Sequence, residues 1–139
     1  MLVIDASTWF DLFNTWDEER RKLAERFFEK AEHHPIYEPP LFKIELAGLL
    51  VRRVKRRVIE NLIREILAKV VLYTGLHDEA YNVALETGCR AADAYCIACA
   101  KLTGSTLVSN DRIQVLNARK AGVKAYYLLG EAEDILRQL

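Results

Sequence analysis

Two acidic side chains stand where buried strands are expected to end. Asp5 ends the apolar run at residues 2–4, and Asp111 comes three residues after the apolar run at residues 106–108. Such runs are typical of buried parallel strands, so both acids are expected at the carboxyl edge of a sheet. Each acid could instead cap the helix that follows it, because aspartate is a favoured N-cap residue.

Two further acids interrupt apolar helix faces. Glu45 has Leu41 and Leu49 one helical turn before and after it, which places it on or beside the core-facing stripe. Asp93 begins the inward face that Cys96 continues. An unpaired buried carboxylate costs several kcal/mol or takes a raised pKa, so both positions need an explanation. For Asp93, capping of its own helix is the simple alternative.

If these four acids converge on one cleft, their mutual repulsion requires a cation. Oxygen-only ligands favour Mg²⁺ or Mn²⁺ over zinc. Such a site suits phosphodiester hydrolysis, because the metal lowers the pKa of an attacking water and neutralises charge on the phosphate. No Ser-His-Asp or Cys-His arrangement is evident as a rival, and His33, His34 and His77 are expected at the surface.

The elements that must position these acids alternate along the chain. Apolar runs predict strands at residues 2–4, 34–38, 70–73, 106–108 and 124–127, with 34–38 at the edge of the sheet or beside it. Helical spacing predicts helices at 7–14, 17–31, 39–67 with a break near 55–57, 78–86, 93–102, 112–121 and 131–139. This alternation predicts an α/β fold, in which ligands bind where the strand order reverses.

Length and composition predict one domain spanning residues 1–139. The chain weighs 16.0 kDa and is 51% hydrophobic and 29% charged, which is typical of a compact globular protein. No apolar run is long enough to span a bilayer and no signal-peptide pattern opens the chain, so a cytoplasmic location is expected. A net charge of zero is neutral evidence about nucleic acid, because a local basic patch decides binding.

The three cysteines are Cys89, Cys96 and Cys99, an odd number that does not suit a disulfide framework. Cys96 and Cys99 form a CxxC pair in a strongly helical stretch, and no second pair or nearby histidine completes a zinc site. We favour buried small apolar side chains, with a metal or redox role as the alternative.

Two surface features could bind a partner. A basic cluster follows Glu45 and is made up of Arg52, Arg53, Lys55, Arg56 and Arg57. It is either a solvated helix face or a phosphate track, meaning a row of basic side chains that binds the phosphates of RNA. Arg90 and Arg112, which lie beside the last two acids in sequence, could extend such a track. Apolar side chains also crowd the first helix, more than one face can bury, so part of them could form a groove for a peptide or a dimer contact: Trp9, Phe10, Leu12, Phe13 and Trp16.

At these residues the chain resembles the PIN-domain family, particularly the VapC toxins of prokaryotic toxin–antitoxin pairs. Val3-Ile4-Asp5-Ala6-Ser7 resembles the first motif, a strand ending in an acid with a hydroxyl residue two positions later. Glu45 resembles the second acid, and Asp93-Ala94 the third. Leu107-Val108-Ser109-Asn110-Asp111-Arg112 resembles the fourth motif, and Gly122-Val123-Lys124-Ala125 the closing strand. The motifs are short, but four in order over essentially the whole chain are fairly specific.

The resemblance implies a three-layer α/β/α sandwich with a central, mostly parallel sheet and Mg²⁺- or Mn²⁺-dependent endoribonuclease activity. It also implies RNA as substrate, a homodimer and, for VapC members, a VapB-like antitoxin. Ser109 stands where the family commonly has threonine, so Asp111 could act as an outer ligand through water. The catalytic and metal-binding residues would be Asp5, Glu45, Asp93 and Asp111, supported by the hydroxyls of Ser7 and Ser109.

Two other functions stay open. The chain could be a housekeeping PIN nuclease that trims RNA precursors, or a PIN-like module that binds RNA or protein without cutting. A flavodoxin-like or receiver-like fold is a more distant alternative, because there is no glycine-rich phosphate loop and no clearly placed receiver lysine.

Overall fold

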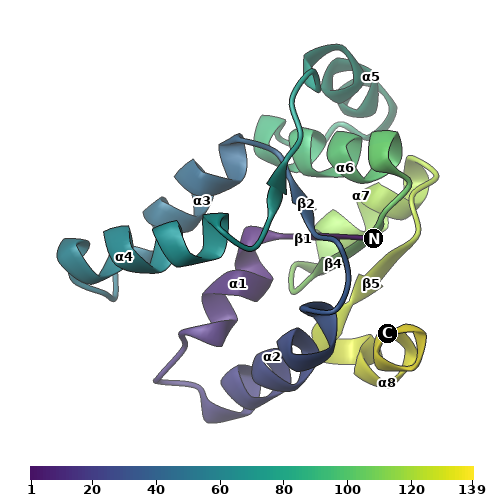
Figure 1. Ribbon diagram of the computed structural model, residues 1–139. Helices are drawn as coiled ribbons and strands as arrows, with labels where there is room; N and C mark the ends of the chain where they lie inside the picture. Colours follow the sequence, from purple (N-terminus) through teal and green to yellow (C-terminus); the bar gives the residue numbers. More distant parts are fainter.

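Short parallel strands run through the middle of the structure, a computed structural model that describes residues 1–139 (Figure 1). One sheet has the order β1-β4-β5, and a second pair joins β2 to β3. A single parallel bridge, from Leu2 to Ile36, connects the two sheets. The strands are β1 (Leu2–Ile4), β2 (Tyr37–Glu38), β3 (Val71–Leu72), β4 (Thr106–Ser109) and β5 (Ala125–Tyr127). The prediction of a mostly parallel sheet is therefore confirmed.

A side chain completes the junction between β1 and β2. The backbone N–H of Ile4 donates a 2.7 Å hydrogen bond to Oε1 of Glu38, whose side chain is buried. β2 pairs with β3 on its other side, and these two strands form a second sheet beside β1-β4-β5. The strand predicted at the edge of the sheet or beside it therefore lies beside it, and β3 and β5 are the outer strands. The flanking prolines, Pro35 and Pro39, lie outside the two residues that pair.

Eight helices surround the strands. The long helix predicted from residue 39 to 67 is two helices, and the turn between them occupies residues 51–55, slightly earlier than expected. In this turn the N–H of Val54 donates to the carbonyl of Leu50 at 2.8 Å. The helices are α1 (Ala6–Leu12), α2 (Glu18–Ala31), α3 (Leu41–Leu50), α4 (Arg56–Leu67), α5 (His77–Thr87), α6 (Ala91–Thr103), α7 (Arg112–Lys120) and α8 (Leu128–Gln138).

Two hydrophobic cores lie on opposite faces of the sheet, because side chains alternate along a strand. Leu2 and Ile4 pack with α1, α2, α3, α4 and α8, whereas Val3 packs with α5, α6 and α7. Figure 1 shows these two sets of helices on either side of the strands. This arrangement is the three-layer α/β/α sandwich that the sequence predicted. No helix combines the length and apolar character needed to cross a membrane.

The strand order reverses between β1 and β4. From β1 the chain continues to β2 and β3 on one side, and it then returns to build β4 and β5 on the other side. In open α/β sheets, ligands bind outside the carboxyl ends of strands at such a point. Asp5 follows β1 and Asp111 comes two residues after β4, so both lie at this position.

Candidate functional site

Asp5 caps α1 and keeps one oxygen free. Its Oδ2 accepts hydrogen bonds from the hydroxyls of Ser7 at 2.6 Å and Ser109 at 3.0 Å, and weakly from the Ser7 N–H. Its Oδ1 has no hydrogen-bond partner. The helix-capping alternative is therefore correct for Asp5, but it occupies only one of the two carboxylate oxygens.

Asp111 is arranged in the same way at the start of α7. Its Oδ1 accepts hydrogen bonds from the backbone N–H groups of Ile113 at 2.9 Å and Gln114 at 3.3 Å. Its Oδ2 has no such partner, and its own N–H donates to the Ser109 hydroxyl at 2.9 Å. Asp111 is thus a helix cap whose second oxygen can still act on a ligand or a water.

Asp93 does not cap its helix. Arg90 occupies the N-cap position of α6, and Asp93 lies within the first helical turn. The capping alternative for Asp93 was therefore wrong, because the helix begins two residues earlier than the apolar spacing indicated. The Asp93 side chain is only 12% exposed, and its one charged partner is the guanidinium of Arg90, with Nε 3.5 Å from Oδ2.

Glu45 projects from α3 toward the other acids. Helix α3 packs against α1, which begins directly after Asp5, and against α6, which carries Asp93 in its first turn. The Glu45 side chain is partly buried and has no hydrogen-bond or ion-pair partner. This agrees with the position on the border of the core-facing stripe that its leucine neighbours predicted.

The pKa values show that the acids share one electrostatic environment. Burial, followed by the charges of Asp5 and Asp93, raises the pKa of Glu45 to about 7. Burial and the charge of Asp5 raise the pKa of Asp93, against the opposing effect of Arg90. Burial also raises the pKa of Asp5, although its serine hydrogen bonds act in the opposite direction and Asp111 adds repulsion. The four carboxylates therefore repel one another across one region that contains a single nearby arginine.

This donor set fits a hard divalent cation. All the candidate ligands are oxygens, Asp5 and Asp111 each keep an oxygen without a hydrogen bond, and the negative charge is not balanced. No three Asp, Glu, His or Cys side chains are placed so that they could hold an ion directly. Mg²⁺ usually keeps several waters and binds through one or two carboxylates, so direct contact by three acids is not required.

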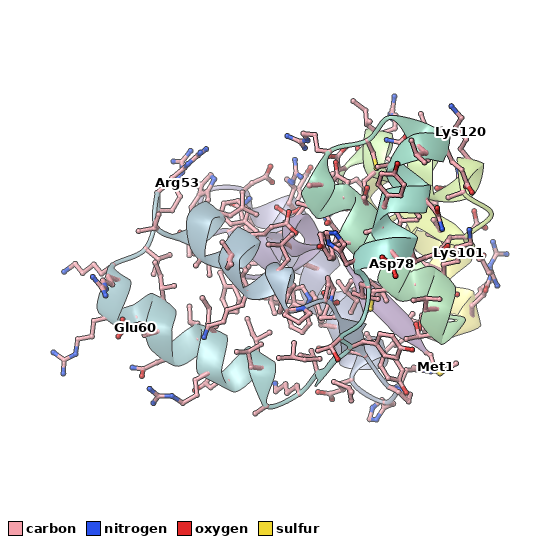
Figure 2. All side chains as sticks on the ribbon, turned by 90° about the horizontal axis from the view of Figure 1, so that it is seen from above. Met1, Arg53, Glu60, Asp78, Lys101 and Lys120 are labelled. Carbon is pink, nitrogen blue, oxygen red and sulfur yellow. The ribbon has the colours of Figure 1, made fainter.

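The predicted basic cluster lies away from the acids. All five residues are exposed, and they occupy the turn between α3 and α4 and the start of α4. Figure 2 shows Arg53 at the outer end of this hairpin, on the opposite side of the molecule from Lys120. At about 1.5 Å per helical residue, Arg52 and Arg53 lie roughly 10 Å beyond Glu45. Helix α3 therefore separates the cluster from Glu45.

The two remaining predicted RNA-binding residues differ in position. Arg90 contacts Asp93, as described above. Arg112 opens α7 next to Asp111, and its guanidinium lies 5.3 Å from the ring centre of Tyr127. Of these two arginines, only Arg90 forms an ion pair with one of the candidate acids.

Glu38 is a buried acid that the sequence did not single out. Its pKa is raised well above the usual value by burial first, with the charges of Asp5 and Glu45 adding to the rise. It accepts a hydrogen bond from the backbone N–H of Ile4, the residue before Asp5. The available signal was an acid at the end of a short predicted strand that prolines bound. Glu38 supports the strand that carries Asp5.

The cysteines and histidines do not contribute to this group of acids. Cys96 and Cys99 are buried, as predicted, and Cys89 is half-buried, with no disulfide among the three. His33 and His77 are exposed as expected. His34 is half-buried, because its Nε2 lies 3.3 Å from the carbonyl of Leu139.

The aromatic side chains of the first helix separate into two groups. Trp9 is buried in the core against Phe28 and Phe42, whereas Trp16 is exposed and lies under the guanidinium of Arg53 at 4.7 Å. The larger groove of the structure lies elsewhere, between α3 and α4, with a volume of about 750 Å³.

Comparisons with known proteins agree with this fold. The sequence pattern of the family described as PIN domain matches residues 2–120. FitAcB from Neisseria gonorrhoeae is similar in structure, with a TM-score of 0.68 at 17% identity over 91% of this chain and 96% of that chain. VapC20 from Mycobacterium tuberculosis, a sarcin-ricin loop cleaving toxin, has a TM-score of 0.68 at 21% identity over 88% of this chain and 96% of that chain. PAE2754 from Pyrobaculum aerophilum gives 0.64 at 21% identity over 92% of each chain. No curated protein matches the chain by sequence.

Proposed function

The chain belongs to the PIN domain family, and from this premise we propose that it is a metal-dependent endoribonuclease, acting as the toxin of a VapBC-type toxin–antitoxin pair. The proposal is supported mainly by the electrostatic effects that Asp5, Glu45, Asp93 and Asp111 have on one another beside the point where the strand order reverses, with the pKa of Glu45 raised to about 7. Such crowding is unfavourable without a cation and suits a site that binds one. The similarity to VapC20, a sarcin-ricin loop cleaving toxin, supports the choice of a cleaving toxin.

Each residue has a proposed role. Asp5, Glu45 and Asp93 hold Mg²⁺ or Mn²⁺, directly or through its waters, and Asp111 orients that shell through its free oxygen. The ion would supply an acidified water and charge neutralisation at the phosphate. Ser7 and Ser109 fix Oδ2 of Asp5 and leave Oδ1 facing its ligand. In the metal-free protein Glu45 would carry a proton for part of the time near neutral pH, and binding of the cation would displace that proton.

A cleavage assay tests this function directly. The purified protein is incubated with single-stranded RNA and with structured ribosomal RNA fragments, in Mg²⁺, in Mn²⁺ and in EDTA. We expect internal cleavage of RNA with either metal and none in EDTA. Binding of RNA without any cleavage, at enzyme concentrations equal to the substrate, would instead support the non-cleaving PIN-like module.

The basic cluster is proposed to bind phosphates that flank the cleavage point. Each phosphate contact on single-stranded RNA adds about 0.7 to the slope of log affinity against log salt concentration. We expect the double variant R53A/R57A to bind RNA more weakly and to lower that slope by about 0.7 for each phosphate that the variant no longer binds. The control K22A/K120A removes two lysines that lie outside the cluster. Equal slopes for the two double variants would exclude the phosphate track.

Exposed apolar side chains on α3 and α5 support the proposed homodimer. Ile44 is 68% exposed, and Tyr81 and Leu85, which share one face of α5, are 64% and 69% exposed. Ile44 also lines a hollow with His77, the first residue of α5. We expect light scattering after size exclusion to give twice the chain mass of 16.0 kDa. A mass of one chain at high micromolar concentration would refute the dimer.

The groove between α3 and α4 is the proposed site for the antitoxin. Its apolar wall is formed by Ala47, Val51, Ile59, Ile63 and Leu67, and its basic residues are Lys43, Arg56 and Arg64. Such a groove suits an amphipathic segment with apolar anchors and acidic neighbours. A small neighbouring gene whose product contains such a segment and co-purifies with the chain would support a toxin. Its absence would favour the housekeeping nuclease.

A further inference from the structure

Asp11 is a buried carboxylate that the proposed chemistry does not use. It lies on α1, is 1% exposed and pairs with Arg20 of α2, whose Nε lies 3.2 Å from both carboxylate oxygens. The Nη2 atom of Arg20 lies 3.1 Å from Oδ2. The same oxygen accepts a 2.7 Å hydrogen bond from Nδ2 of Asn110. Asp11 is therefore anchored by a cation on one side and holds Asn110 on the other.

Asn110 hydrogen-bonds through both ends of its side chain and through its backbone N–H. Its side-chain amide donates to Asp11, and its Oδ1 accepts the backbone N–H of Leu129, in the first turn of α8, at 3.1 Å. Its own backbone N–H donates to the hydroxyl oxygen of Ser7 at 3.1 Å. One residue thus ties the loop after β4 to α1 and α8. It stands between Ser109 and Asp111, which both take part in the candidate site.

These contacts determine how Asp5 is presented. A hydroxyl has one proton, so a serine oxygen that accepts a backbone N–H directs its own proton elsewhere. The Ser7 oxygen accepts from Asn110, and the Ser109 oxygen accepts from Asp111. Both serine protons are then directed to Oδ2 of Asp5. The loop around Asn110 therefore occupies one oxygen of Asp5 and leaves Oδ1 free.

We propose that Asn110, anchored by the Asp11–Arg20 ion pair, is a positioning residue. It fixes the orientation of Asp5 and Asp111 relative to each other for binding the divalent cation. The inference rests on the proposed function, because the cation is part of that proposal. Asn110 would not touch the ion or the RNA. It would act through the Ser7 hydroxyl and through the backbone that leads into Asp111.

Charge exchange between the two partners tests this role. In the variant N110D a second carboxylate faces Asp11 at the 2.7 Å contact. Repulsion between the two carboxylates then replaces the hydrogen bond that Asn110 donates to Asp11. The double variant D11N/N110D keeps the net charge of the natural protein and restores an amide–carboxylate pair, but it removes the ion pair with Arg20, so it tests the contact between positions 11 and 110 alone. The variant N110A removes the side-chain hydrogen bonds of Asn110 without adding charge. The control N82D places the same substitution at an exposed position on α5.

Calorimetric titration with Mn²⁺ alone is the primary readout, and cleavage kinetics are the second. We expect N110A and N110D to bind Mn²⁺ about 10-fold more weakly, to lower kcat and to leave KM for RNA unchanged. The double variant should recover most of both losses, and N82D should match the natural protein. An added negative charge alone would tighten cation binding, so weaker binding by a folded N110D protein is the result that lost positioning predicts.

The outcomes separate this inference from the proposed function. If N110D and N110A fold, as judged by circular dichroism, and bind Mn²⁺ as tightly as the natural protein, the positioning role is refuted. If both single variants unfold, the double variant D11N/N110D is decisive. Folding together with a Mn²⁺ affinity near that of the natural protein supports the positioning role of Asn110. Failure to fold, or a loss of Mn²⁺ affinity, overturns it. A natural protein that neither binds Mn²⁺ nor cuts RNA would overturn the proposed function and this inference with it.

Discussion

Replacing Asp5 or Asp93 with asparagine is expected to lower metal-dependent RNA cleavage on the order of 10²- to 10³-fold, with the fold retained. The amide keeps the size of the side chain but removes the negative charge that would attract the cation. In Asp5→Asn the amide oxygen can still accept the hydroxyl protons of Ser7 and Ser109, so α1 stays capped. In Asp93→Asn only the pairing with Arg90 is lost.

Single-turnover cleavage with saturating enzyme measures this effect, alongside thermal unfolding of each variant. Asp78→Asn provides a matched control, because Asp78 lies in the first turn of α5 and is exposed (Figure 2). The control should cut RNA at the natural rate. A folded Asp93→Asn protein that also cuts at the natural rate would remove Asp93 from the site.

Glu45→Gln is expected to stabilise the metal-free protein at pH 8 while it weakens metal binding. The pKa of Glu45 rises from 4.5 to about 7 on folding, because its charge is unfavourable when partly buried beside Asp5 and Asp93. Between these values the folded state binds more protons than the unfolded chain, so the free energy of unfolding falls as the pH rises. Removing the charge should recover about 1 to 2 kcal/mol at pH 8, after allowance for the partial exposure of the group.

Urea unfolding in EDTA at pH 4 and at pH 8 measures this difference. At pH 4 Glu45 is largely protonated in both states, so the natural protein and the variant should differ little in stability from this cause. At pH 8 added Mn²⁺ should stabilise the natural protein more than the variant, because only the natural protein keeps the full ligand set. A Glu45→Gln protein that is less stable than the natural one at pH 8 would contradict the proposed electrostatic crowding.

The same carboxylate should make cation binding depend on pH. A metal binds the deprotonated carboxylate, so binding competes with a proton wherever the pH is below the pKa. The apparent Mn²⁺ affinity is therefore expected to rise as the pH increases from 6 to 8, measured by calorimetric titration. In Glu45→Gln this rise should be smaller, and an equal rise in both proteins would assign the pH dependence to another group.

The sequence predicted the layers of the fold because its periodicities were clear. Leu2, Val3 and Ile4 form a wholly apolar run, and the structure buries all three, with alternate residues in opposite cores. The same reasoning placed Asp5 and Asp111 at strand ends. It could not decide between helix capping and ligand binding, because the two uses occupy different oxygens of one carboxylate. Only atomic positions distinguish Oδ1 from Oδ2.

Other features depended on packing that periodicity does not reveal. Glu38 is buried because β2 lies between two strands, and its side chain replaces a backbone hydrogen bond to Ile4. The positioning role proposed for Asn110 could not be predicted from sequence, because it depends on how α8 packs against the loop after β4. The basic cluster was adjacent to Glu45 in sequence, but α3 carries it away from the acids. Because a helix separates the two groups, their distance in space could not be judged from sequence proximity.

The most direct test of the central claim is a crystal structure of the protein grown with Mn²⁺, in which anomalous scattering locates the ion. We expect one strong anomalous peak beyond the carboxyl ends of β1 and β4, about 2.1 Å from oxygens of one or two of the four carboxylates. The remaining acids should reach the ion through ordered waters. A peak held by other residues, or an empty cleft at Mn²⁺ concentrations that support RNA cleavage, would contradict the claim that Asp5, Glu45, Asp93 and Asp111 form a metal site.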